Sequence, residues 1–259
     1  MIMKNRLKGK TALVTGATSG IGEAIAGQLA ELGVNLIITG RRKERLEKMA
    51  AVLEDEHNIK VTIGTFDITD RAACEKFINS LGADPIDILV NNAGGAHGVD
   101  PVYSGDFKDW DTMIDTNVKG LLTMTRLISP GMKKRNSGHI INIGSIAGHE
   151  AYPGGVVYCA AKHAVTAITK STKMDLTGTN VRVSQVSPGL VETEFSMVRF
   201  KGDKDKADKV YEGMQPLTAD DIAEIVVFVA NRPDHVNLLD TVVFPVAQSA
   251  ATMVARTSP

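Results

Sequence analysis

The sequence is poor in cysteine, in aromatic residues and in long apolar runs. Its two cysteines, Cys74 and Cys159, are too few for a disulfide framework, and neither they nor the six histidines have the spacing of metal ligands. No apolar stretch approaches the roughly 18 residues of a membrane-spanning helix. The basic start, residues 1–10, is followed by an apolar run that Gly16 and Gly20 interrupt, so we predict no signal peptide. We therefore expect a cytoplasmic protein without a disulfide, a metal site or a membrane span.

The sequence also lacks an excess of either charge. It has 29 basic and 30 acidic residues, well mixed, and a formal net charge of -1. This excludes the basic field that nucleic acid or an acidic membrane would require. A chain of 259 residues can form one large domain that buries roughly three quarters of its unfolded surface. With no repeat or linker in the sequence, we predict a single domain over residues 1–259.

Short apolar segments alternate with segments of helical period as far as about residue 187, the pattern of βαβ units around a parallel sheet. Strands are predicted at residues 11–15, 34–39, 60–65, 87–91, 139–144, 181–186 and 239–244. Helices are predicted at residues 20–32, 42–56, 70–81, 106–132, 155–177 and 219–230. The expected fold is α/β, a Rossmann-like doubly wound parallel sheet of about seven strands with helices on both faces. The polar segment at about residues 189–215 breaks the alternation and is predicted to be a lid.

A glycine-rich turn joins the first predicted strand to the first predicted helix. Gly16, Gly20 and Gly22 would let the backbone turn sharply and approach a pyrophosphate, whose charge the helix N-terminus stabilises. Such a triplet is a weak signal alone, since glycine turns also merely connect elements. Its place between a strand and an apolar-faced helix favours a dinucleotide site. The predicted contacts in the turn also include Thr18, Ser19 and Ile21.

The second predicted strand is followed by two arginines, Arg41 and Arg42. A site that prefers NAD would usually place Asp or Glu here, and there is none between Glu31 and Glu44. Two cations at the start of a helix oppose its dipole unless an anion lies between them. The 2'-phosphate of NADP is such an anion, so we predict NADP as the cofactor. The alternative is a solvated helix end.

Three further side chains form a candidate catalytic set. Tyr158 and Lys162 lie four residues apart, on one face of a helix that would begin after Gly154 and Gly155. Bringing a tyrosine pKa from roughly 10 to near 7 requires about 4 kcal/mol, which a positive charge about 4 Å away supplies at an effective dielectric constant of about 20. We therefore expect Lys162 to lower the pKa of Tyr158, and Ser145 to bind the same substrate oxygen. The alternative is an amphipathic helix that carries the pair by chance.

The turn, the Tyr-x-x-x-Lys pair and a serine thirteen residues before the tyrosine together resemble the short-chain dehydrogenase/reductase family over nearly the full length. The resemblance implies that Asn117 is the fourth catalytic residue and holds a water of the proton relay. It also implies that Tyr158 and Lys162 contact the cofactor. Further implied cofactor contacts are Asp67, Ile68, Asn91, Ala93, Gly94, Pro188, Gly189, Val191 and Thr193.

Segments 40–46, 109–117 and 189–203 are similar to the branch of NADP-dependent 3-hydroxy-acid dehydrogenases within this family. The resemblance implies hydride transfer at the 3-hydroxyl carbon of serine, allo-threonine, 3-hydroxyisobutyrate or a related acid. A carboxylate substrate needs a cation, for which Arg199 in the predicted lid is the first candidate and a solvated arginine the alternative.

Other functions remain open at this point. One is an NADPH-dependent reductase of 3-oxoacyl carriers, sugars or ketones on the same fold, and another is an NADP-sensing regulator without catalysis. Nucleotide-sugar epimerases share the glycine turn but usually have a larger C-terminal region. The predicted helices at residues 106–132 and 155–177 are apolar on more than one face. Together with the resemblance, this implies a homotetramer assembled partly through them.

Overall fold

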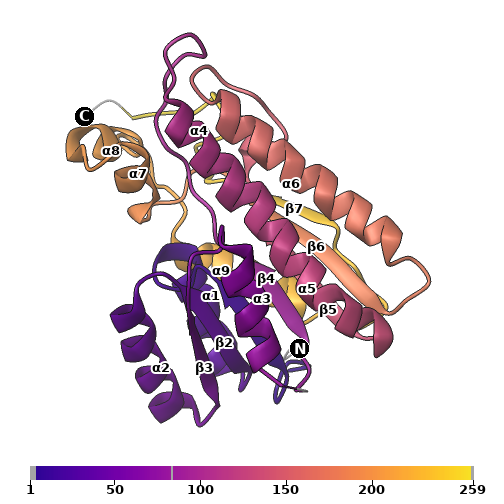
Figure 1. Cartoon of the computed structure of the whole chain (residues 1–259). Helices are drawn as coiled ribbons and strands as arrows, with labels where there is room; N and C mark the ends of the chain where they lie inside the picture. Colours follow the sequence, from indigo (N-terminus) through magenta and orange to yellow (C-terminus); the bar gives the residue numbers. More distant parts are fainter. Residues whose placement is uncertain (1–3, 83, 258–259) are drawn as a thin grey trace.

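The computed structural model describes residues 4–82 and 84–257, so the ends of the predicted domain, residues 1–3 and 258–259, lie outside it. Its strands form one parallel sheet in the order β3-β2-β1-β4-β5-β6-β7 (Figure 1). The strands are β1 (Thr11–Thr15), β2 (Asn35–Gly40), β3 (Val61–Thr65), β4 (Ile88–Asn91), β5 (Gly138–Ile143), β6 (Val181–Pro188) and β7 (Asp240–Val243). The predicted fold class is confirmed.

Helices cover both faces of the sheet, as the alternation in the sequence predicts. They are α1 (Gly20–Glu31), α2 (Lys43–His57), α3 (Arg71–Ser80), α4 (Phe107–Ile114), α5 (Leu121–Lys134), α6 (Val156–Asp175), α7 (Glu194–Arg199), α8 (Lys204–Lys209) and α9 (Ala219–Ala230). Among the described residues, no helix combines the length and the apolar character that crossing a membrane requires.

The long helix predicted at residues 106–132 is wrong as one regular α-helix. A π-helical turn, Asp115–Gly120, separates α4 from α5. Asn117 lies in this turn, and its Nδ2 donates to the carbonyl of Met113 over 2.8 Å. A regular α-helix would give this carbonyl to the backbone N–H four residues later. A buried side chain thus competes for a helical acceptor, which hydrophobic periodicity does not reveal.

Other boundaries differ from the predictions by one or two residues, because pairing rather than hydrophobicity ends a strand. β6 continues to Pro188, which pairs with Val243 of β7. The predicted lid contains two short helices that the sequence pattern did not indicate. Each has a side-chain cap: Thr193 accepts from the backbone of Phe195 before α7, and Asp203 accepts from that of Lys206 before α8.

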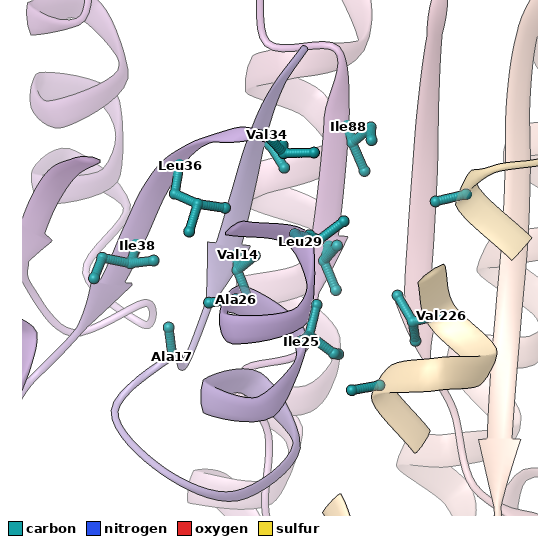
Figure 2. Close-up of a cluster of buried hydrophobic side chains, with 14 of the residues drawn as sticks. Val14, Ala17, Ile25, Ala26, Leu29, Val34, Leu36, Ile38, Ile88 and Val226 are labelled. Atoms are coloured by element: carbon teal, nitrogen blue, oxygen red, sulfur yellow. The ribbon is translucent and has the colours of Figure 1, made fainter. Parts of the chain in front are cut away.

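The core consists of two apolar layers, one on each side of the sheet. On one face α1, α2 and α9 pack on the strands, and Figure 2 shows Ile25 and Leu29 of α1 near Val14 of β1, with Val226 of α9 beside them. On the other face Met124 and other apolar residues of α3 and α5, together with Leu176 just after α6, bury the opposite side of the same strands. Two covered faces explain why the strands are continuously apolar.

The chain order of the strands reverses next to β1. β1 pairs with β2 on one side and with β4 on the other, so connections leave in opposite directions from this point. Ligands of doubly wound sheets bind at the carboxyl ends of the strands beside such a switch point. The glycine-rich turn follows β1 here, and the loops after β4, β5 and β6 end at the same edge.

Candidate active site

A cavity of about 700 Å³ opens at the carboxyl edge of the sheet. Its wall is formed by the loops after β1 to β6 and by the segment that carries α7. It contains most of the residues that the sequence singled out. These are Gly16, Thr18, Ser19, Gly20, Ile21, Arg41, Arg42, Asp67, Ile68, Ala93, Gly94, Ser145, Tyr158, Lys162, Pro188, Gly189, Val191, Thr193 and Arg199. The volume is in the range of cofactor and substrate sites.

Three predicted site residues, Gly22, Asn91 and Asn117, do not line the cavity. At Gly22 an added Cβ would lie 2.3 Å from Nδ2 of Asn92, so this glycine serves close packing of α1 behind the turn. Asn91 is buried, and its amide donates to Thr125 and Asn142 beneath the cavity floor. Its side chain is thus committed to the protein interior. Gly22 and Asn91 thus support the site from behind, and their predicted direct contact with the cofactor stays a prediction.

The turn after β1 has the shape of a phosphate cradle. Gly16 has a φ of 67°, and a Cβ there would lie 2.9 Å from Cα of Ala93, so no side chain fits. Asn92 holds the turn by donating from Nδ2 to the carbonyls of Thr15 and Gly16. Ser19 precedes α1 but its side chain does not cap the helix. The first N–H groups of α1 therefore have no side-chain acceptor from Ser19 and can bind an anion.

The two arginines after β2 have different surroundings. Arg42 donates from Nε and Nη2 to Oγ1 of Thr18 over 3.0 and 2.7 Å, and from Nη2 to Oγ of Ser19 over 2.6 Å. Arg41 is exposed over 77% of its side chain and lies 3.6 Å from a carboxylate oxygen of Asp67. Arg42 thus holds the glycine-rich turn in place, whereas the exposed guanidinium of Arg41 is able to bind an anion at the edge of the cavity.

Sequence reasoning missed two charged residues beside this pair. Arg45 lies one helical turn after Arg42, and both guanidinium groups lie 2.9 Å from the carboxylate of Glu194. Glu194 is the first residue of α7, so this contact joins α2 to the lid. The i, i+3 spacing of the arginines places them on one helix face. Their shared partner, Glu194, is 149 residues away from Arg45, so the sequence pattern gives no sign of the contact.

The catalytic candidates Tyr158 and Lys162 lie on one face of α6, which begins after Gly155 as predicted. Both are buried, and Lys162 donates from Nζ to the carbonyl of Ile143 over 2.9 Å. The same nitrogen lies 5.9 Å from the centre of the Tyr158 ring. Ser145 follows β5, its Oγ accepts from the backbone N–H of Ala147 over 3.1 Å, and it lies close enough to Tyr158 to lower the pKa of that phenol. The three side chains therefore meet on the cavity wall.

Burial opposes the expected lowering of the Tyr158 pKa. Burial raises the pKa of Tyr158 above its ordinary value, with a smaller contribution from Tyr152, while the Ser145 hydrogen bond and Arg199 lower it. Burial also lowers the pKa of Lys162 to about 8. Burial disfavours the charged form of each side chain, and this effect dominates both pKa values. The pair as folded favours the neutral phenol.

Asn117 stands behind the cavity rather than in its wall. Its Nδ2 donates to the carbonyl of Gly95 over 2.8 Å, and its Oδ1 accepts from the N–H of Gly95 over 3.2 Å. A Cβ at Gly94 would lie 2.5 Å from this oxygen. Asn117 therefore fixes the loop after β4 against the π-helical turn. Its implied role in a water relay stays a prediction.

The lid brings two side chains to the tyrosine. The ring of Phe195 lies 5.8 Å from that of Tyr158, measured between centroids. The guanidinium carbon of Arg199 lies 5.8 Å from the Tyr158 ring and 5.6 Å from the Tyr152 ring. Arg199 also donates from Nε to the carbonyl of Gly98 over 3.3 Å. A cation thus lies next to the proposed acid and base, as a carboxylate substrate would require.

Comparison with known proteins agrees with this geometry. The family model described as short chain dehydrogenase matches residues 10–204. NADP-dependent 3-hydroxy acid dehydrogenase YdfG from Salmonella typhi is 50% identical over 249 residues, which cover 95% of this chain and 99% of that protein. The NADP-dependent 3-hydroxy acid dehydrogenase from Schizosaccharomyces pombe is 45% identical over 255 residues, 97% of this chain and 98% of that protein.

Solved structures extend the comparison to three dimensions. The closed form of serine dehydrogenase complexed with NADP+ superimposes with a TM-score of 0.89 at 48% identity, covering 96% of this chain and all of that one. Serine dehydrogenase from Escherichia coli gives a TM-score of 0.79 at 44% identity, over 92% and 99% of the two chains. By its sequence and its structure, the chain belongs to the short-chain dehydrogenase family.

Proposed function

We propose that this protein is an NADP-dependent oxidoreductase that transfers a hydride to or from the 3-hydroxyl carbon of a small 3-hydroxy acid, such as serine, allo-threonine or 3-hydroxyisobutyrate. The observation that carries the proposal is the pairing of a buried tyrosine with a lid arginine in one cavity, 5.8 Å apart between guanidinium carbon and ring centre. The relatives that bear this activity in their names support it.

The residues of the cavity fit NADP. The turn after β1 would hold the pyrophosphate, Arg41 with Arg42 the 2'-phosphate, and Asp67 the adenine. The loops after β4 and β6 would hold the two riboses and the nicotinamide. When bound, NADP supplies or accepts the hydride at C4 of its nicotinamide ring. Gly16 and Gly20, both at positive φ, leave room for a close approach of the phosphates to the backbone.

Tyr158 is the residue that we propose for proton transfer. In the reducing direction its phenol donates a proton to the substrate oxygen, and the raised pKa keeps that proton in place until the oxygen becomes basic. In the oxidising direction the same oxygen takes the hydroxyl proton, and Ser145 and Arg199 favour the phenolate by hydrogen bonding and charge. Ser145 would also donate to the developing oxyanion. Lys162, anchored on Ile143, would contact the nicotinamide ribose.

Arg199 is proposed to bind the substrate carboxylate. We expect Arg199→Ala to raise KM for a 3-hydroxy acid by about 10- to 100-fold, the effect of losing a charge-assisted hydrogen bond. KM for a neutral secondary alcohol should change much less. Steady-state kinetics with both substrate types measures the difference, and Lys206→Ala, which removes an exposed cation from α8, is the matched control. Equal changes for the acid and the alcohol would remove Arg199 from the site.

The proposal extends to domain organisation, location and assembly. We propose one catalytic domain over residues 1–259 with its lid at about residues 189–215, acting in the cytoplasm on a small molecule. We also propose a homotetramer, supported by apolar side chains on the outer surfaces of α5 and α6: Leu122 and Val156 are 43% and 46% exposed. The buried centres of interfaces between identical subunits are more apolar than the rest of a protein surface.

A substrate panel tests the central proposal. Serine, allo-threonine, 3-hydroxyisobutyrate, acetoacetyl thioesters and simple ketones would each be assayed with NADP(H) and with NAD(H), by the absorbance of the reduced nicotinamide. We expect the highest kcat/KM for a 3-hydroxy acid with NADP+. Higher kcat/KM for a thioester or a neutral ketone would favour a reductase of those compounds instead, and no turnover with any compound would favour a nucleotide-sensing regulator.

A further inference from the structure

Helix α7 is held over the cavity by charged contacts at both of its ends. At its start, the carboxylate of Glu194 bridges Arg42 and Arg45, with 2.9 Å between the paired atoms in each case. Beyond its end, Lys201 lies 2.8 Å from a carboxylate oxygen of Asp109 in α4. One contact lies beside the glycine-rich turn and the other joins the segment after α7 to α4. Between them α7 carries the residues that face Tyr158.

The ion pairs at the start of α7 are made by side chains that are about half exposed. Glu194 is 48% exposed, and Arg45 is 50% exposed, so neither is held by burial. Hydrogen bonds from Arg42 and then Arg45 keep the pKa of Glu194 below its usual value. Arg45 also donates to the backbone carbonyl of Thr18 over 3.2 Å. The carboxylate thus closes a chain of contacts from the turn, through two guanidinium groups, to the first residue of the lid helix.

From this arrangement we propose that Glu194 is a positioning residue that sets substrate affinity. Its ion pairs with Arg42 and Arg45 fix the first turn of α7, and α7 in turn places Phe195 and Arg199 beside Tyr158. The inference rests on the proposed function, because KM for the substrate is its kinetic readout. Glu194 touches no reacting atom, so its loss should alter substrate binding more than the chemical step.

The variants Glu194→Gln and Arg45→Gln test the proposal. Arg45 does not line the cavity, so its replacement leaves the wall intact. We expect Glu194→Gln, which loses two partly exposed ion pairs, to raise KM for the 3-hydroxy acid about fivefold, and Arg45→Gln, which loses only one of them, to raise it by less; kcat should change little in both. The double variant should be no worse than Glu194→Gln alone, because that substitution already removes the contact of Glu194 with Arg45. Glu192→Gln is the control: Glu192 lies two residues earlier, is exposed, and makes no ion pair within the described part of the chain.

Hydrogen exchange gives a readout that needs no turnover. Amides of α7 should exchange faster in Glu194→Gln than in the wild type, while Glu192→Gln should match the wild type. Multiplicative effects of the two substitutions on KM, or equal exchange of α7 in Glu194→Gln and Glu192→Gln, would overturn the proposal. If the wild type turns over no 3-hydroxy acid, the proposed function fails, and the exchange experiment alone still decides whether Glu194 holds α7.

Discussion

Tyr158→Phe should lose turnover by at least about 10²- to 10⁴-fold, the usual contribution of general acid or base catalysis. The substitution removes one oxygen and keeps the ring that packs near Phe195. NADPH binding should therefore persist. The measurements are kcat with the best substrate of the panel and the Kd for NADPH by fluorescence titration.

The control for this variant is Tyr211→Phe. The Tyr211 hydroxyl bonds Ser196 and the carbonyl of Val191, both groups of the chain itself. We expect this variant to keep most of its turnover. If Tyr158→Phe kept substantial activity, or if both tyrosine variants lost it equally, the proton transfer assigned to Tyr158 would be refuted.

The second large effect concerns the choice of cofactor. We expect the Arg41→Ala, Arg42→Ala double variant to raise the Kd for NADPH by about 10- to 100-fold, because a phosphate loses charge-assisted hydrogen bonds. The Kd for NADH should change far less, since that cofactor has no 2'-phosphate. Binding titrations with both cofactors give the two ratios.

Two single variants sharpen this experiment. Arg42 also holds Thr18 and Ser19 of the glycine-rich turn, so Arg42→Ala should weaken both cofactors to some extent. Among the described residues the ion-pair partner of Arg41 is Asp67, at 3.6 Å, and Arg41 does not hold the glycine-rich turn, so Arg41→Ala should act on NADPH alone. Lys43→Ala removes a cation from the same helix end without touching the cavity and serves as the control. Equal losses for NADPH and NADH in Arg41→Ala would contradict the assignment.

Much of the fold and site could be predicted because their signals are local. Continuous apolar strands and helical periodicity report burial on two faces, and the order of elements then determines a doubly wound sheet. Tyr158 and Lys162 could be paired from their spacing, since residues four apart share a helix face. The glycines of the turn could be located because Gly16 and Gly20 adopt positive φ, which other residues rarely do.

What could not be predicted depends on burial or on distant contacts. The raised pKa of Tyr158 follows from its complete desolvation, which no spacing reveals. The bridge between Arg45 and Glu194 joins residues 149 positions apart. Asn91 and Gly22 were predicted as cofactor contacts, and only the packed structure shows that they lie behind the cavity wall. Motifs thus indicate which residues belong to the site, while packing determines which of them line the cavity and which are buried behind it.

The π-helical turn between α4 and α5 changes the direction in which the two helices point their apolar side chains. A regular α-helix rotates by about 100° per residue, so one extra residue in a turn shifts the phase of everything after it by about that angle. α4 directs Met113 to the cluster around Tyr158, whereas α5 directs Met124 and Ile128 to the sheet. The deletion of a single residue at 115–120 would turn the apolar stripe of α5 away from the strands. The extra residue thus lets one continuous helical segment contribute side chains to two apolar clusters, the one around Tyr158 and the one on the sheet.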